Sequence, residues 1–258
     1  MEPSKDALER EKEWHEQGFY VDSGHWTSHP FFASRERHWL HNMVQKIRFY
    51  GYLDRFSKSK PYARKAKMLL APAGDGSDVY FLQGLFSEVH GIDISPLALA
   101  RCPHNVITKE ADISESGYSE ASFDIIVCSQ FLHHVHEIGF DRFIKEFHRI
   151  LRPGGILAIL EPSALHPINQ ATALASRVLG NVTSKVDGER PIHPPSLTRC
   201  LHQNGFHQVK IRGLLFTHVR VPSFLQSFTN TVDAPFRALW PFRNCANAVG
   251  WYAEKSES

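Results

Sequence analysis

The stretch "VHGIDISPLALA", residues 89–100, joins the signal of a strand directly to the signal of a helix. Its first half is rich in β-branched side chains and leads to Asp93, which is typical of a buried strand. Pro96 then suits the first turn of a helix, where the missing N–H of proline costs no hydrogen bond. Because a strand that runs into a helix is the repeating unit of α/β folds, this stretch predicts such a fold.

The same alternation continues on both sides of this stretch. Strands are predicted at 67–71, 87–94, 105–112, 123–130, 156–162, 207–219 and 246–255. Helices are predicted at 4–17, 35–50, 77–86, 96–102, 140–151 and 197–206, with Gly51 stopping the second, Ser77 capping the third and "RPGG" (152–155) ending the fifth. The strands are largely apolar, as in a parallel sheet buried on both faces. The pattern therefore predicts an α/β domain with a mostly parallel sheet.

Composition and charge argue against several other classes of protein. The chain has 258 residues, 42% of them hydrophobic, and a net charge of +2, whereas nucleic-acid-binding domains usually concentrate Lys and Arg. The four cysteines are far apart and predict neither a zinc site nor a disulfide framework, so we expect a reducing, cytoplasmic setting. The N-terminus is too polar for a signal peptide, and no apolar run approaches the ~18 residues of a membrane span.

Polar residues follow the predicted strands at the ends where an open parallel sheet binds its ligands. They are Gly74 and Gly76 after the first strand, Asp93 at the end of the second, Asp112 after the third, and Ser129 and Gln130 after the fourth. The glycines allow a ligand to approach the backbone, and an acid placed like Asp93 accepts the hydroxyls of a ribose. Asp112 could accept from the amine of a purine. The alternative is that the glycines only turn the chain and the aspartates cap helices.

Five segments together resemble the signature of class I S-adenosylmethionine-dependent methyltransferases, of the small-molecule, type 11-like kind. They are "MLLAPAGDGSD" (68–78), "VHGIDISPLALA" (89–100), "EADI" (110–113), "FDIIVCSQFLHHV" (123–135) and "RILRPGGILAILEP" (149–162). The resemblance covers roughly 66–162. It implies a Rossmann-like, seven-stranded, mostly parallel sheet with helices on both faces and a reversed last hairpin. It also implies S-adenosylmethionine as cofactor and S-adenosylhomocysteine as product.

The resemblance also implies roles for individual residues. Those implied to contact the cofactor are Ala73, Gly74 and Gly76 near its methionine part, Asp93 at the ribose, Ile94, Asp112 and Ile113 around the adenine, and Ser129 and Gln130 beneath the methionine part. The glycine loop departs from the family pattern at two places. Leu70 stands where the family usually has an acid, and Pro72 stands for the first glycine. The first change removes one polar contact, and we expect both to affect the affinity for the cofactor.

Methyl transfer requires alignment of the acceptor with the methyl group and often removal of a proton from the acceptor. His133 and His134 follow the fourth strand, and we expect His134 to lie nearer the site and to act as the base, with the other histidine packing structurally. His25, His166 and His193 lie in segments that can cover the site. The tract "HHVH" (133–136) has no acidic or cysteine partners at metal spacing, so no metal site is expected.

Two domains are predicted: an N-terminal helical cap at 1–60 and a methyltransferase domain at 61–258. Insertions at 163–195 and 221–242 are expected to form a lid with the cap. Their aromatic residues either pack on the core or line the pocket: Trp26, Phe31, Phe32, Phe224, Phe228, Phe236 and Trp240. If several line the pocket, the acceptor is apolar or aromatic.

Other functions remain as alternatives. A nucleobase amine methyltransferase usually carries Asn/Asp-Pro-Pro-aromatic where this chain has "SQFL" (129–132), and Cys128 lies inside a strand rather than in a nucleophile loop. A dinucleotide dehydrogenase would share the glycines and Asp93 but not the later segments. We therefore expect a small-molecule substrate and no nucleic acid, as a monomer or a homodimer. A protein that binds the cofactor without transferring methyl groups, as a scaffold or regulator, is the main alternative, and a protein or nucleic-acid methyltransferase is a weaker one.

Overall fold

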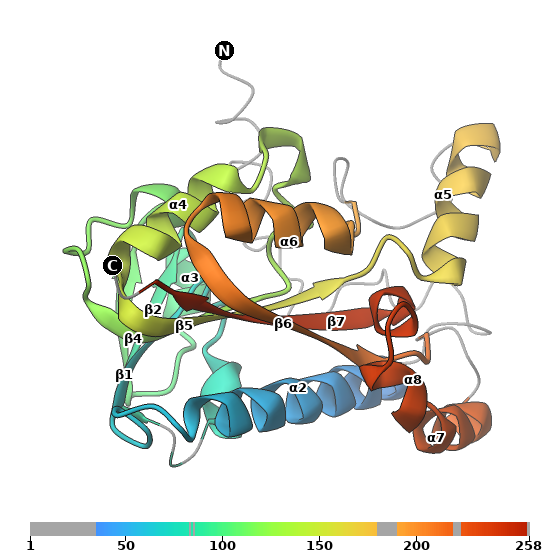
Figure 1. Ribbon diagram of the computed structural model, residues 1–258, viewed down its shortest axis with the longest axis horizontal. Helices are drawn as coiled ribbons and strands as arrows, with labels where there is room; N and C mark the ends of the chain where they lie inside the picture. Colours follow the sequence, from blue (N-terminus) through green and yellow to red (C-terminus); the bar gives the residue numbers. More distant parts are fainter. Residues whose placement is uncertain (1–34, 83, 85, 180–189, 219–222, 257–258) are drawn as a thin grey trace.

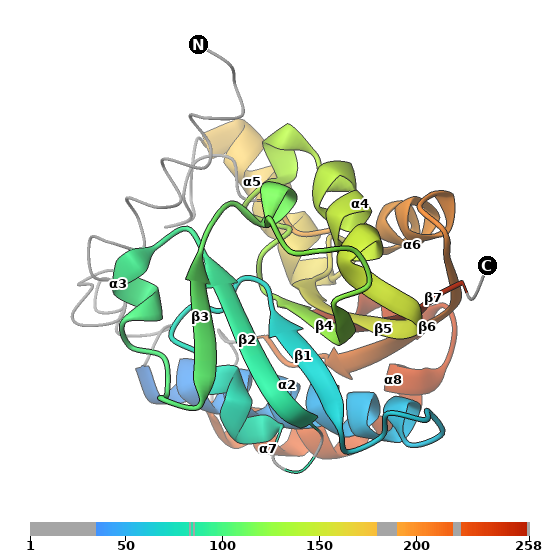
Figure 2. The same ribbon diagram turned by 90° about the vertical axis from the view of Figure 1, so that its left-hand side faces the viewer.

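Seven strands form one sheet (Figure 1), and their order is β3-β2-β1-β4-β5-β7-β6 (Figure 2). The computed structural model describes residues 35–82, 84, 86–179, 190–218 and 223–256. The strands are β1 Ala66–Leu70, β2 Phe86–Asp93, β3 Val106–Glu110, β4 Phe123–Ser129, β5 Leu151–Pro162, β6 Phe206–Leu215 and β7 Ala248–Lys255. Strands β1 to β5 are parallel, whereas β7 pairs antiparallel with both β5 and β6. The predicted Rossmann-like, seven-stranded, mostly parallel sheet with a reversed last hairpin is confirmed.

Helices cover both faces of this sheet (Figures 1 and 2). The α-helices are α2 Arg35–Ser57, α3 Pro96–Leu99, α4 Asp141–Ile150, α5 Pro167–Leu179, α6 Pro194–Gln203, α7 Ser223–Val232 and α8 Ala234–Ala238. Short 3₁₀ turns are η2 Ser77–Phe81, η3 Ile113–Glu115, η4 His136–Ile138 and η5 Phe242–Cys245. Helices α4 and α6 lie on one face and α2 on the other, which gives three layers.

Strand β4 shows how the apolar sequence builds both halves of the core. Successive side chains of a strand point to opposite faces. Ile126 and Cys128 belong to the apolar cluster beneath α4 and α6, whereas Ile125 and Val127 belong to the cluster beneath α2. All four are at most 1% exposed. Because burying one such aliphatic side chain contributes roughly 1.5–3 kcal/mol, a continuous apolar run is stable only as a central strand.

Three predicted boundaries were wrong. Helix α2 continues through Gly51 to Ser57, because Leu53 is fully buried beyond the glycine and outweighs the ~1 kcal/mol that glycine costs in a helix. The predicted helix at 77–86 is only the 3₁₀ turn η2, which follows a left-handed Gly76 without a cap from Ser77, because β2 already begins at Phe86. The "RPGG" tract is part of β5 rather than a separate turn.

A buried ionic network joins α2 to the last third of the described chain. Arg48 Nη1 donates to the carbonyl oxygen of Leu214 at 2.7 Å and to Asp233 Oδ2 at 2.9 Å. Arg237 Nε donates to the other oxygen of Asp233 at 2.9 Å, and Asp233 is 3% exposed. Helix α2 is therefore bonded to β6 and to the α7–α8 segment. The division at residue 60 stays a prediction, and the helix predicted at 4–17 lies outside the described residues.

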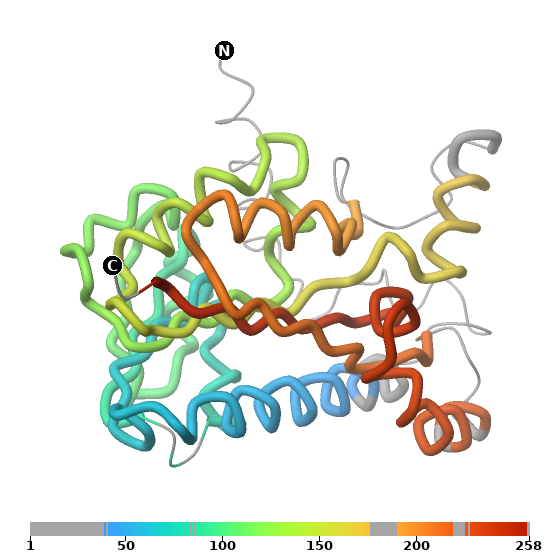
Figure 3. Tube along the Cα trace, viewed as in Figure 1, coloured from blue at the N-terminus to red at the C-terminus, as the bar shows by residue number. Residues whose placement is uncertain are grey.

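Helices α5, α7 and α8 lie at the edge of the sheet where the parallel strands end (Figure 3). Helix α5 continues from β5, and α7 lies on the opposite side of the sheet. This edge carries the ends of β1, β2 and β4, so it is where the predicted site residues should meet.

Candidate active site

The loop after β1 turns sharply and is bonded to the end of β2. Gly74 and Gly76 both have positive φ values, 53° and 67°, which favour glycine. The N–H of Ala73 donates to the carbonyl oxygen of Ile92 at 2.8 Å, and the N–H of Gly74 donates to Asp93 Oδ2 at 2.9 Å. The predicted glycine loop and the predicted acid are therefore in direct contact.

Gly76 is needed for the packing of the loop as well as for its sharp turn. A Cβ on this residue would lie 2.9 Å from Pro103 Cδ and 3.0 Å from Cys102 Sγ. The space above Gly76 is thus filled by the segment that precedes β3. For Gly76, this observation supports the alternative in which the glycine serves the packing and the turn of the chain. Gly74 is half-buried and lies beside Asp93.

The fold accommodates both departures from the family pattern. Leu70 is 1% exposed within the apolar cluster beneath α2, where an unpaired carboxylate would be costly. Pro72 has no N–H to donate. The backbone bonds that attach the loop come instead from its neighbours, because the N–H of Ala71 donates to Val127 and that of Ala73 to Ile92, at 2.9 and 2.8 Å.

Asp93 has a structural role that the sequence did not reveal. Its side chain is 4% exposed, and besides Gly74 it accepts the N–H of Ser95, at 2.9 Å from Oδ1. Asp93 thus ties the glycine loop to the residue before α3. Each oxygen of a carboxylate can accept up to two hydrogen bonds.

Asp112 caps a helix and also pairs with an arginine. Its Oδ1 accepts the N–H and the hydroxyl of Ser114 at 2.7 and 2.8 Å, which caps η3. Its Oδ2 accepts from Arg142 Nη2 of α4 at 3.1 Å. The capping alternative therefore holds for Asp112, and no local sequence signal predicted Arg142 as its partner.

Glu161, near the end of β5, organises the turn that follows β4. Its side chain is fully buried, and Oε1 accepts the N–H groups of Phe131 and Leu132 at 2.9 and 2.6 Å. Its Oε2 lies 2.7 Å from His133 Nδ1. Sequence reasoning missed this residue, whose signal was a single acid near the end of an otherwise apolar strand.

The rings of the two histidines predicted after β4 are in contact, with centroids 4.1 Å apart and planes inclined by 37°. His133 is 8% exposed, and His134 is half-buried. The carboxylate beside Nδ1 of His133 favours the tautomer that carries its proton on Nδ1, so that Nε2 is the basic nitrogen. The preference for His134 as the base stays a prediction, and the structure adds that His133 has the carboxylate partner.

The other residues predicted to contact the cofactor lie around the same edge. Gln130 has a positive φ of 57°, which is uncommon outside glycine and which clusters at functional sites. Its N–H donates to the carbonyl oxygen of Leu160 at 2.8 Å. Ile113 is 4% exposed within the cluster beneath α4, whereas Ile94 and Ser129 are half-buried.

Cys128 is buried in β4 and is not a nucleophile. Burial, together with the negative charge of Glu161, raises the pKa of its thiol well above the usual value. A thiol held in its protonated form is unreactive. This agrees with the exclusion of a cysteine-dependent base methyltransferase.

The residues predicted to cover the site have mixed surroundings. Phe228, Phe236 and Trp240 are 65%, 44% and 72% exposed, so they do not pack in the core. His166 is buried, with Nε2 3.0 Å from the carbonyl oxygen of Phe216. His193 is exposed and lies beside Ser196 at the start of α6. His25, Trp26, Phe31 and Phe32, and the side chain of Phe224, lie outside the described residues.

Comparison with known families identifies the segment that carries these residues. The family model described as "Methyltransferase domain" matches residues 71–159. These residues are similar to the methyltransferase domain family. The match begins directly after β1, at the glycine loop, and ends within β5, so the matched segment includes β2, β3 and β4. The resemblance drawn from the sequence is confirmed.

Relatives in sequence match this methyltransferase domain over part of their length. An uncharacterised methyltransferase of Synechocystis sp. is 33% identical over 98 residues, which are 37% of this chain and 46% of that protein. The chain spans about half the length of the first curated relatives it matches, 46% and 51%.

Solved structures share the fold at low sequence identity. A Thermotoga maritima S-adenosylmethionine-dependent methyltransferase, described as a possible histamine N-methyltransferase, superposes with a TM-score of 0.58 at 16% identity, covering 84% of this chain and 95% of that one. The Burkholderia thailandensis 1,6-didemethyltoxoflavin-N1-methyltransferase superposes with a TM-score of 0.57 at 14% identity, covering 99% and 92%. That structure contains 1,6-didemethyltoxoflavin and S-adenosylhomocysteine. These likenesses establish the fold of the methyltransferase domain.

Two further properties concern the described part of the chain alone. None of its helices is long and apolar enough to cross a membrane. None of its His, Cys, Asp and Glu side chains gather in groups of three or more that could hold a metal ion.

Proposed function

We propose that the chain transfers a methyl group from S-adenosylmethionine to a small-molecule acceptor. The observation that carries this proposal is the contact between the glycine loop and Asp93, at the same sheet edge as the pair formed by His133 and Glu161. The first pair suits a nucleoside ligand, and the second suits removal of a proton.

The residues present fit this cofactor. The left-handed Gly74 allows close approach to the backbone, and Asp93 beside it can accept ribose hydroxyls. Asp112 lies beyond the neighbouring strand β3, where an adenine amine would need an acceptor. When bound, S-adenosylmethionine supplies an electrophilic methyl group on a positively charged sulfur.

The protein's own part in the reaction is to align the acceptor and to take its proton. Glu161 fixes the ring of His133 through Nδ1 and stabilises the imidazolium that forms when Nε2 accepts a proton. Glu161 is held in turn by the N–H groups of Phe131 and Leu132, so the pair is oriented before the acceptor binds. We propose His133 as the base and His134, whose ring contacts it, as the second candidate.

A small acceptor is supported by the low net charge of +2 and by the small-molecule ligand of the Burkholderia relative. The exposed Phe228 and Phe236 support our prediction of an apolar or aromatic acceptor. We also propose the division into a cap at 1–60 and a methyltransferase domain at 61–258, with lid insertions at 163–195 and 221–242. All four cysteines are free, which supports a reducing, cytoplasmic setting.

Binding of the cofactor without transfer is the second candidate function. The observation in its favour is that Leu70 replaces the usual acid and lies in an apolar cluster. The glycine loop would then bind the cofactor without the polar contact that the usual acid provides.

Calorimetry and a methyl-transfer assay separate these functions. We expect S-adenosylhomocysteine to bind at micromolar concentration, and labelled methyl groups to pass from S-adenosylmethionine to members of a panel of small acceptors. His133→Asn should lower turnover roughly 10²–10⁴-fold and leave the affinity for S-adenosylhomocysteine unchanged. Glu161→Gln should lower turnover and shift the pH–rate profile to lower pH, because the imidazolium loses its carboxylate. The exposed Glu115→Gln is a matched control.

Each outcome has a clear reading. If no heat of binding is measured at millimolar S-adenosylhomocysteine, the proposal that S-adenosylmethionine is the cofactor is refuted. If S-adenosylhomocysteine binds but no acceptor is methylated, the second candidate function is favoured. If His133→Asn turns over normally and His134→Ala loses turnover, the base is His134 rather than His133.

A further inference from the structure

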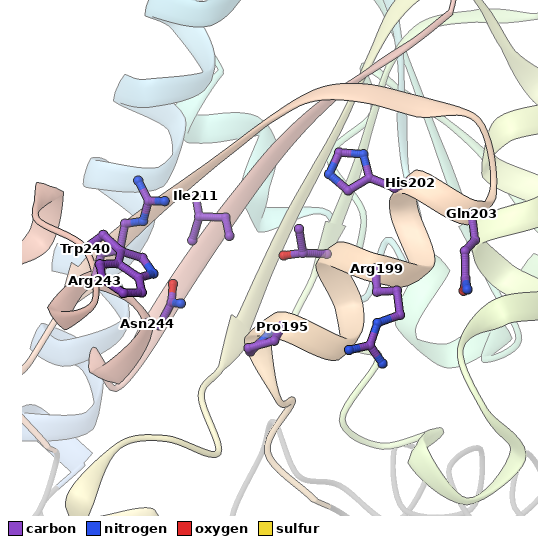
Figure 4. Close-up of a pocket in the computed structure, with 9 residues that line it drawn as sticks. Pro195, Arg199, His202, Gln203, Ile211, Trp240, Arg243 and Asn244 are labelled. Atoms are coloured by element: carbon purple, nitrogen blue, oxygen red, sulfur yellow. The ribbon is translucent and has the colours of Figure 1, made fainter.

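A groove of about 600 Å³ lies between α6 and η5, at the β6 edge of the sheet (Figure 4). Ile211 of β6 lies between its two walls. One wall is α6, with Thr198, Arg199 and His202, and the other is formed by the segment from Trp240 to Asn244. A volume of this size holds a small organic molecule.

This groove is separate from the candidate active site. None of its lining residues belongs to β1, β2, β3 or β4, or to the loops that follow them. The groove therefore needs an explanation of its own.

The charge of the lining points to an anion. Arg199 and Arg243 line the groove together with His202, and no Asp or Glu does. Neither arginine forms an ion pair with any part of the chain that the structure describes. By contrast Arg48, Arg142, Arg149, Arg152 and Arg237 all face carboxylates. An arginine without an acid partner beside a groove is a common means of binding carboxylate or phosphate groups.

Two buried polar atoms in the same wall lack partners. Arg243 Nε and Asn244 Oδ1 are both buried, and neither has a hydrogen-bond partner among the described residues. Burial, together with the nearby charge of Arg212, lowers the pKa of the Arg243 guanidinium, as expected where no anion stabilises it. Buried polar groups in native proteins are almost always satisfied, so these two atoms leave unused hydrogen-bonding capacity in the wall that lines the groove.

The same wall offers an aromatic surface. Trp240 lines the groove and is 72% exposed, which is unusual for the largest apolar side chain. A flat apolar group could bind between this indole and Ile211 while its charged end lies near Arg243.

We propose that the groove between α6 and η5 binds a small organic anion that carries a flat apolar group on a carboxylate or phosphate. Arg243 and Arg199 attract the anionic end, Asn244 accepts a hydrogen bond from a polar substituent, and Trp240 stacks on the apolar part. This binding site is independent of methyl transfer.

Calorimetry with three probes tests the proposal on the full chain. The probes are 2-naphthoate, 2-naphthyl phosphate and the neutral 2-naphthol. We expect at least one anion to bind at least tenfold more tightly than 2-naphthol. Arg243→Gln should weaken that binding at least tenfold and Trp240→Ala at least threefold. Arg64→Gln, which removes the same charge from an exposed loop before β1, is the matched control and should change nothing.

A second measurement keeps the result independent of the active site. Saturating S-adenosylhomocysteine should leave the affinity for the naphthyl anion unchanged, and each variant should retain the wild-type circular dichroism spectrum. The preference between the two anions identifies the charged group. The proposal is overturned if neither anion binds at millimolar concentration, if 2-naphthol binds equally well, if Arg243→Gln folds and binds normally, or if S-adenosylhomocysteine competes with the probe.

Discussion

Replacing Asp93 with asparagine separates the structural role of this residue from its role in ligand binding. Asp93 accepts the N–H of Gly74 at Oδ2 and the N–H of Ser95 at Oδ1, both at 2.9 Å, and is 4% exposed. An asparagine offers one oxygen, so its amide must direct N–H groups at one of these two backbone donors. One hydrogen bond to a charged group is lost and one buried donor is left unsatisfied, which together cost about 3 kcal/mol.

Urea unfolding without ligand measures this cost, and calorimetry with S-adenosylhomocysteine measures the second role. We expect Asp93→Asn to lower the free energy of unfolding by about 3 kcal/mol. We also expect it to weaken S-adenosylhomocysteine binding at least tenfold, or about 1.4 kcal/mol.

Asp75→Asn is the matched control, since it removes the same charge from the glycine loop that contacts Asp93. Within the described residues, Asp75 accepts only a local bond from Ser77 at 3.0 Å, which asparagine can reproduce, so the cost should be below about 1 kcal/mol. Unfolding of Asp93→Asn within about 0.5 kcal/mol of wild type would refute the reasoning about its two backbone contacts. Unchanged affinity in a folded variant would remove Asp93 from the cofactor site.

Two glycines and one histidine give further predictions. Gly155→Ala should lower the free energy of unfolding by about 2 kcal/mol, because its Cβ would lie 2.8 Å from the carbonyl oxygen of Arg152. Gly51→Ala in α2 should instead raise the free energy of unfolding by about 0.5–1 kcal/mol, because its Cβ would meet nothing within 4 Å. Equal effects of the two substitutions in urea unfolding would contradict this reasoning. Burial lowers the pKa of His166, so the folded state binds its proton less readily than the unfolded chain. The contribution of His166 to stability is therefore complete above pH ~6.5 and is lost as pH falls below it. His166→Gln should reduce the slope of unfolding free energy between pH 5 and 7, and an unchanged slope would exclude His166 as a source.

The strands were predictable because their apolar composition indicates that they are buried. Phe123, Ile125, Ile126 and Val127 are apolar in succession, and only a strand covered on both faces buries all of them. Helix ends were less predictable, since the end of α2 depends on how Leu53 packs against the sheet rather than on Gly51 itself. The number of strands and the reversed last hairpin were implied by the family resemblance, and the order of the strands was not predicted, because periodicity does not say which strands are neighbours.

The polar partners of the site were not predictable for a related reason. Glu161 and Arg142 lie far along the chain from His133 and Asp112, and only the sheet brings each pair together. The donors that hold Asp93 are backbone N–H groups, which the identity of a residue does not reveal. The sequence therefore predicted that these residues lie at the carboxyl edge of the sheet, where the structure has them, but not which contacts hold them there.

The antiparallel position of β7 has a consequence for how the chain is synthesised. Strand β6 occupies the edge of the sheet and pairs with β7, while β7 also pairs with β5. As residues emerge from the ribosome in order, β1 to β5 can assemble with one another, but residues 206–215 have no strand to join until residues 248–255 have emerged. During that interval the α7–α8 segment is made while the strand it packs on is still unattached. Completion of the sheet, and of the Arg48–Asp233 network with it, is thus timed by the last strand rather than by the methyltransferase segment that precedes it.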